Sequence, residues 1–403
     1  VKPVEGFQWS NPPTANYIDT KVYAKLRELQ ILPSDLCSDN DFVRRVHLDV
    51  TGQLPTLAET RAFLADIRHD KRAHRIEELL TRPEHANFWA QKWGDLLRLE
   101  PGKVTTAGTQ KYYQWLVQAF IKNLPYDRFA RELLTASGST FIHPPANYYR
   151  AAKDTNDALE TTSQIFLGNR LACAKCHNHP YEAITQDDYY GLAAYFARVK
   201  LKGRVFGLDR EIVYVGREGQ VKHAATGKVM QPTAFGNVAT EVSPGEDVRR
   251  QLADWVANPD NRWFARSTVN RIWSHLFGEG IVDPVDDLRE SNPPSNEALL
   301  EALTADFIKQ GYRFKPLIRT IVTSQAYRLG ARPVVQSRYA ADPRRYVTST
   351  QVTMLSAEQI LDAISLATGV SEKFPGYPLG TRAVQLAEGA VDHNFLKSFS
   401  KPV

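Results

Sequence analysis

The segment Thr56-Leu-Ala-Glu-Thr-Arg-Ala-Phe-Leu-Ala-Asp-Ile67 shows how this chain builds its fold. Its first four residues form a capping box. The Thr56 hydroxyl accepts a backbone N–H of the first turn, and the Glu59 carboxylate reaches back to the N–H of Thr56. The segment therefore predicts a helix that continues to about Ile67. Similar boxes, some with an acidic third residue, predict further helix starts at Ser38 to Asp41, Thr185 to Asp188, Ser243 to Glu246 and Ser356 to Gln359.

Apolar residues repeat at helical spacing over much of the chain. Val248, Leu252, Trp255 and Val256 occupy positions i, i+4, i+7 and i+8, which form one face of a helix. The same spacing occurs in residues 299–307 and 317–322, and residues 85–100 and 111–122 predict aromatic-rich helices. We take these aromatic residues as core residues.

One region departs from the helical pattern. Residues 203–240 contain alternating runs such as Glu211-Ile-Val-Tyr-Val215 and many glycines, which predict a small β insert. We therefore expect a mainly α-helical fold. Two helical domains, residues 14–202 and 244–403, would be joined by a β-containing insert at residues 203–243. This organisation differs from an ordinary small cytochrome c fold.

Composition narrows the classes of function. The chain has 403 residues, enough to bury a large core without cross-links, and its net charge of +5 comes from dispersed Lys and Arg. Such a charge distribution does not indicate nucleic-acid binding. No run of 18 apolar residues occurs, so no transmembrane helix is predicted. Because the chain starts at Val1 without a signal peptide and its end carries no helix stop signal, we expect a processed piece of a longer polypeptide.

The segment Cys173-Ala-Lys-Cys-His177 carries the chemistry of this chain. Cys-x-x-Cys-His is the signature of covalent c-type haem attachment. Each thiol adds to one vinyl group of the porphyrin, and the two intervening residues let both sulfurs reach. The histidine that follows then becomes the proximal ligand of the iron. We therefore predict haem c bound through Cys173 and Cys176, with His177 as proximal ligand.

Other uses of the motif stay open. Cys173 and Cys176 could hold zinc or iron together with His177 or His179, or they could form a redox disulfide or occupy a quiet loop. The only other cysteine is Cys37, so the second Cys pair of an ordinary zinc ribbon is missing. No hydrolase, metalloprotease or P-loop motif occurs elsewhere, and the sequence identifies no catalytic residue.

The ligand on the second face of the iron would decide the function. A methionine or a second histidine there would make an electron-transfer centre, and an open position would allow small-molecule chemistry. Met230, one of two methionines, follows His177 by 53 residues and is compatible with that role, although single methionines more often serve packing. His179 is too close in sequence to His177 to reach the opposite face of the haem. We therefore expect it to orient a metal ligand through a hydrogen bond, or to serve as an alternative metal ligand. Further candidates for the distal position are His47, His143, His223, His275 and His393.

Carboxylates also cluster in Asp283-Pro-Val-Asp-Asp287, followed by Asn292-Pro-Pro-Ser. Their oxygens could bind a hard cation, but a turn that caps the next helix is the simpler interpretation.

Three groups of segments resemble a known family. They are residues 42–56, residues 171–180 with 185–196, and residues 269–289 with 292–295. Together they are similar to planctomycete cytochrome-associated proteins that pair the domains of unknown function 1549 and 1553. The resemblance implies export to the periplasm or cell surface, a separate cytochrome domain in many members, and a second domain that extends past Val403. It also implies that Cys173, Cys176, His177 and His179 form the family's presumed haem or metal element.

These observations favour an exported haem c protein that transfers electrons with a redox partner protein or a cytochrome domain. If the protein is an enzyme, the motif makes it a haem-linked oxidoreductase. One alternative is a zinc or iron protein that uses Cys173, Cys176, His177 and His179. The other is a cell-surface interaction protein in which the motif only stabilises a turn.

Overall fold

The computed structural model describes residues 6–99, 102–152, 154–178, 183–203, 211–236, 242–243, 245–334, 345–387 and 391–399. Its first half is a series of helices: α1 (Tyr17–Glu28), α2 (Asp39–Thr51), α3 (Leu57–Ala65), α4 (Lys71–Thr81), α5 (Pro83–Leu96), α6 (Thr106–Ile121), α7 (Tyr126–Leu134), η1 (Pro144–Ala146), α8 (Asn147–Ala151), α9 (Thr155–Thr162), η2 (Ser163–Leu167), η3 (Ala172–Lys175) and α10 (Gln186–Ala194). The second half contains α11 (Arg249–Val256), α12 (Phe264–Phe277), α13 (Glu297–Lys309), α14 (Phe314–Val322), α15 (Ala357–Thr368), η5 (Ala383–Gln385) and α16 (Asn394–Phe399).

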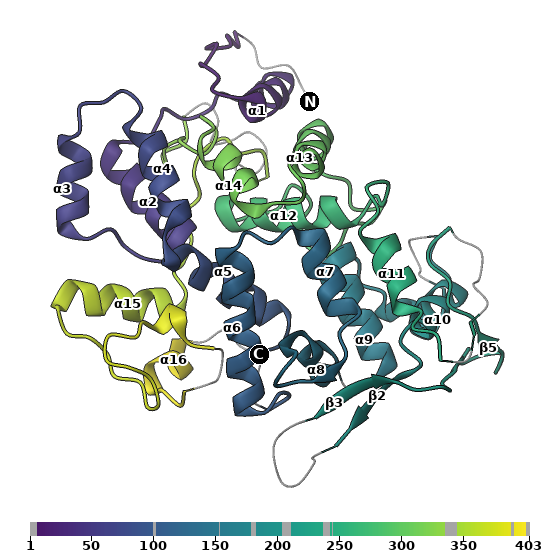
Figure 1. Ribbon diagram of the computed structural model, residues 1–403. Coiled ribbons are helices and arrows are strands. Elements are labelled where there is room, and N and C mark those ends of the chain that lie inside the picture. The colour runs from purple at the N-terminus through teal and green to yellow at the C-terminus, as the bar shows by residue number, and fades with distance from the viewer. Residues whose placement is uncertain are drawn as a thin grey trace.

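The β structure is small. Strand β3 (Ile212–Val215) pairs antiparallel with β1 (Gly138–Ser139) and with β2 (Val199–Lys202), where Val199 faces Val215. A separate hairpin joins β4 (Val221–Lys222) to β5 (Val229–Met230). The strands lie at one edge of the helical body (Figure 1). The mainly α fold with a small β portion, which the sequence predicts, is thus confirmed.

Helix starts show why the local sequence forms these elements. The Thr56, Thr185 and Ser356 side chains each accept the N–H three residues on, and the third residue returns the bond, as a capping box requires. Ser38 also caps its helix. The expected start at Ser243 is wrong, because α11 begins only at Arg249. There Asp247 binds both the backbone N–H and the guanidinium of Arg249, so the helix starts after that turn.

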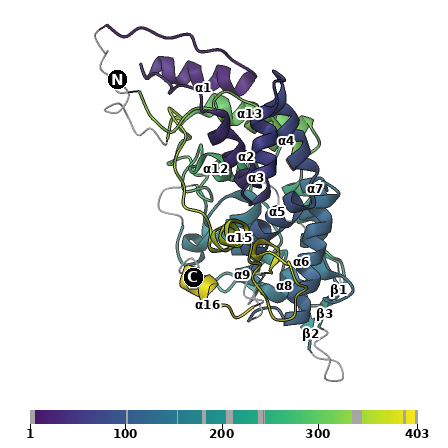
Figure 2. The same ribbon diagram turned by 90° about the vertical axis from the view of Figure 1, so that its left-hand side faces the viewer.

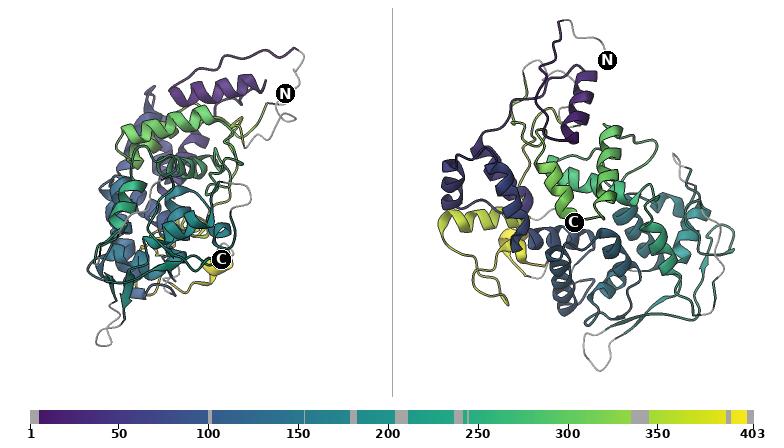
Figure 3. Two further views of the ribbon diagram at one scale, coloured as in Figure 1. Left: turned by 90° about the vertical axis from the view of Figure 1, so that its right-hand side faces the viewer. Right: turned by 45° about the horizontal axis from the view of Figure 1, so that its top comes forward.

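One continuous core contains side chains from both halves. Trp93 of α5 contacts Phe120 of α6, Tyr126 of α7 and Phe314 of α14, with ring centroids 4.9–6.0 Å apart. Such edge and offset contacts add to the burial of large apolar surfaces. The body is broad in the view of Figure 1 and thinner when turned by 90° (Figures 2 and 3). Within the described ranges, no helix combines the length and apolar composition that a bilayer crossing needs.

A smaller core lies near the C-terminal end. Leu361 of α15 packs with Phe374, Ala383 and Leu386, and together they hold α15 and η5 as one C-terminal unit, residues 356–387. In Figure 1 this unit, in yellow, lies next to α2 and α3. Hence the end of the chain returns to the helices near its beginning.

Candidate cofactor site

A sharp turn brings the Cys-x-x-Cys-His segment to the surface. Helix α9 continues into the π-helical turn η2, which ends at Gly168 with φ of +63°. A Cβ at this position would lie 2.9 Å from both Ser267 Cβ and Leu288 Cδ1, so only glycine fits without displacing them. The helix therefore ends at Gly168, and the chain continues into the short turn η3 that carries the motif.

Both motif thiols are free and exposed. Cys173 lies within η3, and the N–H of Cys176 donates to the Cys173 carbonyl over 3.4 Å, so the two residues bracket a single turn. Ala174 between them is fully buried. The turn is thus anchored by its alanine and presents its cysteines to solvent.

The ring of His177 is exposed, with one nitrogen already engaged. Its Nδ1 lies 2.7 Å from the Asn178 carbonyl oxygen. Because a carbonyl only accepts hydrogen bonds, Nδ1 carries a proton, and in the neutral ring Nε2 then keeps its lone pair. A metal-ligating imidazole usually donates its other ring N–H to a carbonyl or carboxylate in this way, which leaves Nε2 available.

Helix α10 holds the motif in place. The carbonyl of Lys175 accepts hydrogen bonds from Gln186 Nε2 at 3.1 Å and from the Tyr190 hydroxyl at 2.9 Å. Gln186 also donates its backbone N–H to Asn178 Oδ1 at 3.0 Å. Burial and the nearby Cys176 thiol together raise the pKa of Tyr190, so its hydroxyl stays protonated and donates. The motif is thereby fixed to the first two turns of α10.

The hairpin β4–β5 packs against the same helix, and it carries two of the candidate ligands. His223 follows β4, and its ring lies 5.2 Å from that of Tyr190. Its Nδ1 accepts N–H bonds from Ala225 and Thr226, so the proton lies on Nε2, 3.6 Å from Asp187. In this tautomer Nε2 of His223 offers no lone pair to a metal.

Met230 lies in β5, half-buried against the main core. It is thus on an element that contacts the motif's helix, and its role as a distal ligand stays a prediction. His179, the other candidate beside the motif, falls in residues 179–182, outside the described residues. Among the residues that the structure describes, no three His, Cys, Asp or Glu side chains come together as a metal-binding group.

The remaining histidine candidates and the third cysteine belong to other parts of the fold. Cys37 is buried, and its sulfur lies 3.6 Å from Arg45 Nη2. His275 packs on Trp89 and its Nε2 lies 3.2 Å from the Asp49 carbonyl, while His47 is buried on α2. Helices α2 and α10 lie on opposite sides of the molecule in Figure 1.

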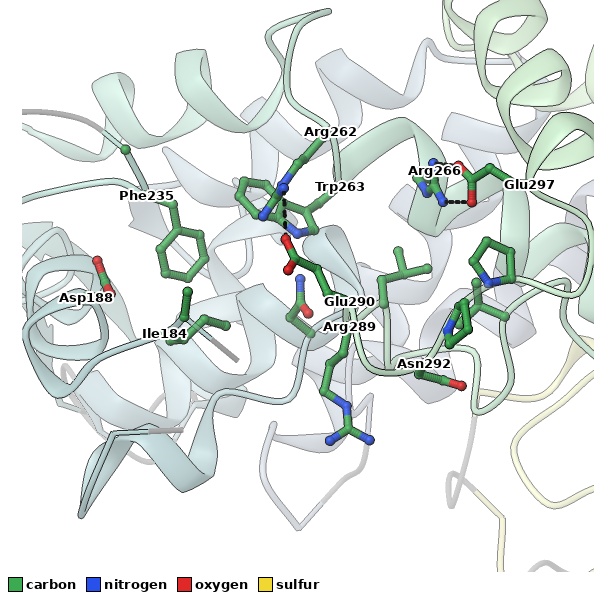
Figure 4. A pocket seen from close by; sticks show the side chains of 17 residues that line it. Ile184, Asp188, Phe235, Arg262, Trp263, Arg266, Arg289, Glu290, Asn292 and Glu297 are labelled. Carbon is green, nitrogen blue, oxygen red and sulfur yellow. Dashed lines mark hydrogen bonds and ion pairs between the residues drawn. The ribbon is translucent and has the colours of Figure 1, made fainter. Parts of the chain in front are cut away.

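A cavity of about 670 Å³ opens next to the motif segment (Figure 4). Asn169 precedes the motif and lines it, as do Ala183, Ile184 and Asp188 after the motif. Cys173, Cys176 and His177 do not line it. Asp188 and Tyr190 lie about 160° apart around α10, so this cavity and the Tyr190–His223 contact are on different faces of the helix.

The opposite wall comes from the second half of the chain. Arg262 lies 4.4 Å above the ring of Trp263 and 3.7 Å from Glu290, and Trp263 also contacts Phe235. Arg266 forms two bonds, of 2.6 and 2.7 Å, to Glu297, as Figure 4 shows. The sequence did not predict this cavity, because nothing local links residues 183–188 to the aromatic and charged residues of 235–297.

The carboxylates at 283–287 act as structural groups. Asp286 binds Arg170 at 2.6 Å and also Gln164. Burial raises the pKa of Asp286, but these hydrogen bonds outweigh it and hold the pKa below its usual value. The N–H of Leu288 donates to the Gly168 carbonyl at 2.8 Å. This segment therefore fastens the second half to the turn before the motif. The predicted helix cap at this segment is wrong, because Asn296 caps α13.

Comparison with known families gives two matches. Residues 17–201 match PSCyt2, described as a protein of unknown function (DUF1549), and residues 248–391 match PSD1, described as a protein of unknown function (DUF1553). The two follow each other in the order that the sequence resemblance implies. No curated protein and no solved structure matches the chain.

Proposed function

Since the chain belongs to the family that pairs a PSCyt2 domain with a PSD1 domain, we propose that it is an electron-transfer protein that binds haem c. Cys173 and Cys176 form the thioether bonds, and His177 is the proximal ligand. Because such attachment takes place outside the cytoplasm, the proposal includes a periplasmic or cell-surface location. The partner is a redox protein or a cytochrome domain.

The observation that carries the proposal is the state of the five-residue motif. Two free, exposed thiols bracket one short turn, and the histidine behind them has Nδ1 engaged and Nε2 open. The residues present therefore fit the group. Bound there, haem would supply one-electron chemistry at the iron.

The chain's own residues position the motif. The Asn178 carbonyl orients the imidazole of His177 and raises the basicity of Nε2. Gln186 and Tyr190 fix the Lys175 carbonyl, which restricts the turn between the two thiols. Hydrogen bonds from α10 thus fix the backbone of the turn that carries the three reactive residues.

The decisive test is the visible spectrum of protein exported together with a c-type maturation system. A Soret band and a pyridine haemochrome that survive denaturation would support covalent haem. We expect Cys173→Ala and Cys176→Ala each to lose one thioether and the pair to lose all covalent haem. Cys37→Ala is the matched control and should retain it, because Cys37 is buried elsewhere.

Other results would favour the alternatives. A protein without a Soret band but with stoichiometric zinc or iron would overturn the haem proposal and support a metal site at the motif. A colourless, metal-free protein would leave a role in interactions. His177→Ala should keep covalent haem but shift the Soret band and the redox potential, and an unchanged spectrum would remove His177 from the iron.

A further inference from the structure

A second cavity lies far from the motif, between α2 and α3 on one side and the C-terminal unit, residues 356–387, on the other. Its volume is about 350 Å³, at the lower end of small-ligand sites. His47, Glu59 and Arg82 line it from the first half of the chain, and Asp362 and Arg382 from the second. The PSCyt2 and PSD1 matches therefore meet at this cavity.

His47 has an unused ring at this wall. The side chain is only 1% exposed, and its buried Nε2 has no hydrogen-bond partner among the described residues. Burial lowers the pKa of His47 to about 4, so the ring is neutral near pH 7 and carries one N–H. A buried polar group of this kind usually has a partner in the native protein.

Arg382 presents a second unused group. Both terminal nitrogens, Nη1 and Nη2, are buried and lack a partner within the described part of the chain. A guanidinium stays charged in proteins, and its planar fork matches a carboxylate in a bidentate fashion. Burial lowers the pKa of Arg382, although the nearby carboxylates of Asp362 and Glu84 partly offset this effect.

Two of the three carboxylates that line the cavity, those of Glu59 and Asp362, already have hydrogen-bond partners, and the third belongs to Glu372. Glu59 accepts the Thr56 N–H at 2.8 Å and pairs with Arg82 at 2.6 Å. Asp362 accepts the N–H groups of Ala383 and Val384 at 2.6 and 3.3 Å. The two unpartnered nitrogens of Arg382 can only donate, and Nε2 of His47 donates when it carries the single proton of the neutral ring, so an acceptor placed in the cavity would satisfy all three.

We propose that this cavity binds a small carboxylate or another oxyanion, held by the guanidinium of Arg382 and by the N–H of His47. The ligand contacts α2 and the C-terminal unit at once, so its binding stabilises their association. This site is independent of the haem proposal.

The test uses the full chain, with acetate and sulfate as probes and chloride at equal ionic strength as the reference. Isothermal titration and thermal unfolding should show saturable binding and a raised Tm in acetate or sulfate. Hydrogen exchange of α15 should slow in the same solutions. Arg382→Gln should weaken binding by about tenfold or more, because a charge-assisted hydrogen-bond pair is lost.

Two further variants separate this site from general salt effects. His47→Gln should weaken binding by a smaller factor, and Arg332→Gln, on an exposed side chain outside this cavity, should bind as the wild type. If neither probe gives saturable binding to the wild type, the cavity holds only water and the proposal is overturned. Equal binding by the wild type and Arg382→Gln would overturn it as well.

Discussion

The hydroxyl of Tyr327 donates a 2.7 Å hydrogen bond to the carboxylate of Asp49 and so joins α2 to the segment after α14. Arg45 lies 4.6 Å above the same tyrosine ring and donates to the Leu329 carbonyl at 3.1 Å. Burial raises the pKa of Asp49 to about 6, against the opposing effects of the Tyr327 bond and of Arg45. The two halves of the chain therefore meet at a carboxyl group that resists ionisation.

This relationship predicts a specific pH dependence of stability. The folded pKa of Asp49 lies above its unfolded value, so its contribution is fullest below pH 4 and is lost as the pH rises through 6. The shift corresponds to roughly 3 kcal/mol at most. We expect about 1–3 kcal/mol, because Asp49 is only half-buried and lines a third cavity, between α2 and residues 350–355. Asp49→Asn removes the titration, so its stability relative to wild type should increase between pH 4 and 7.

Urea denaturation at several pH values measures this difference. Asp41→Asn is the control, because Asp41 lines the same cavity but is exposed. Parallel pH profiles for the wild type and Asp49→Asn would contradict the assignment.

Gly52 ends α2 with φ of +71°, and its position faces the ring of Phe88. Gly52→Ala should destabilise the protein by about 2–4 kcal/mol, because the left-handed backbone strain adds to a clash with a buried ring. Gly369 ends α15 with φ of +70° and has open space around it. Gly369→Ala should therefore cost only about 1–2 kcal/mol. Similar urea midpoints for the two variants would show that Phe88 moves aside freely.

Arg249 is a buried charge that ties α11 to α7. The side chain is 1% exposed, pairs with Asp247 at 2.8 Å and donates to the Ala136 carbonyl at 2.8 Å. Arg249→Met should cost about 2–4 kcal/mol, because it leaves Asp247 and a buried carbonyl without their partner. Arg131 also pairs across these helices, with Asp254, but on the exposed surface. Arg131→Met should cost less than about 1 kcal/mol. Chemical denaturation compares the two, and equal losses would refute the role of burial.

Local signals in the sequence explain much of the helical fold. The boxes at Thr56, Thr185 and Ser356 act through residues three positions apart, so they are visible in the sequence. The box at Ser243 fails because its outcome depends on Arg249, whose guanidinium is held by Asp247 and the distant Ala136 carbonyl. A contact across 113 residues has no local signature.

The candidate site likewise has one part that the sequence shows and another part that only the structure shows. Cys173, Cys176 and His177 are contiguous, so the motif could be found without a structure. The hydrogen bond from Tyr190 to the Lys175 carbonyl depends on the packing of α10 against η3. The cavity beside the motif depends on Trp263 and Arg262 from the other half of the chain. The unused nitrogens of His47 and Arg382 become visible only when burial and partners are known.

The last prediction concerns the clamp on Lys175, which consists of the two hydrogen bonds that its carbonyl accepts from Gln186 and Tyr190. Tyr190→Phe removes one of the two donors to this carbonyl, and Tyr190→Phe with Gln186→Ala removes both. We expect the double variant to release the turn, because each lost hydrogen bond costs about 0.5–1.5 kcal/mol. Cys173 and Cys176 should then react faster with a thiol reagent, which tests the clamp without any cofactor.

Under the haem proposal, the double variant should also carry less covalent haem per protein. Tyr189→Phe is the matched control, because Tyr189 donates to Glu160 of α9 at 2.7 Å and does not touch the motif. If the double variant and the wild type show equal thiol reactivity, the clamp does not restrict the motif. If reactivity rises but haem loading is unchanged, the clamp exists and attachment does not depend on it. Faster thiol reaction together with lower haem loading would show that α10 prepares the two cysteines for the reaction, because a fixed turn keeps both sulfurs at the spacing of the two vinyl groups.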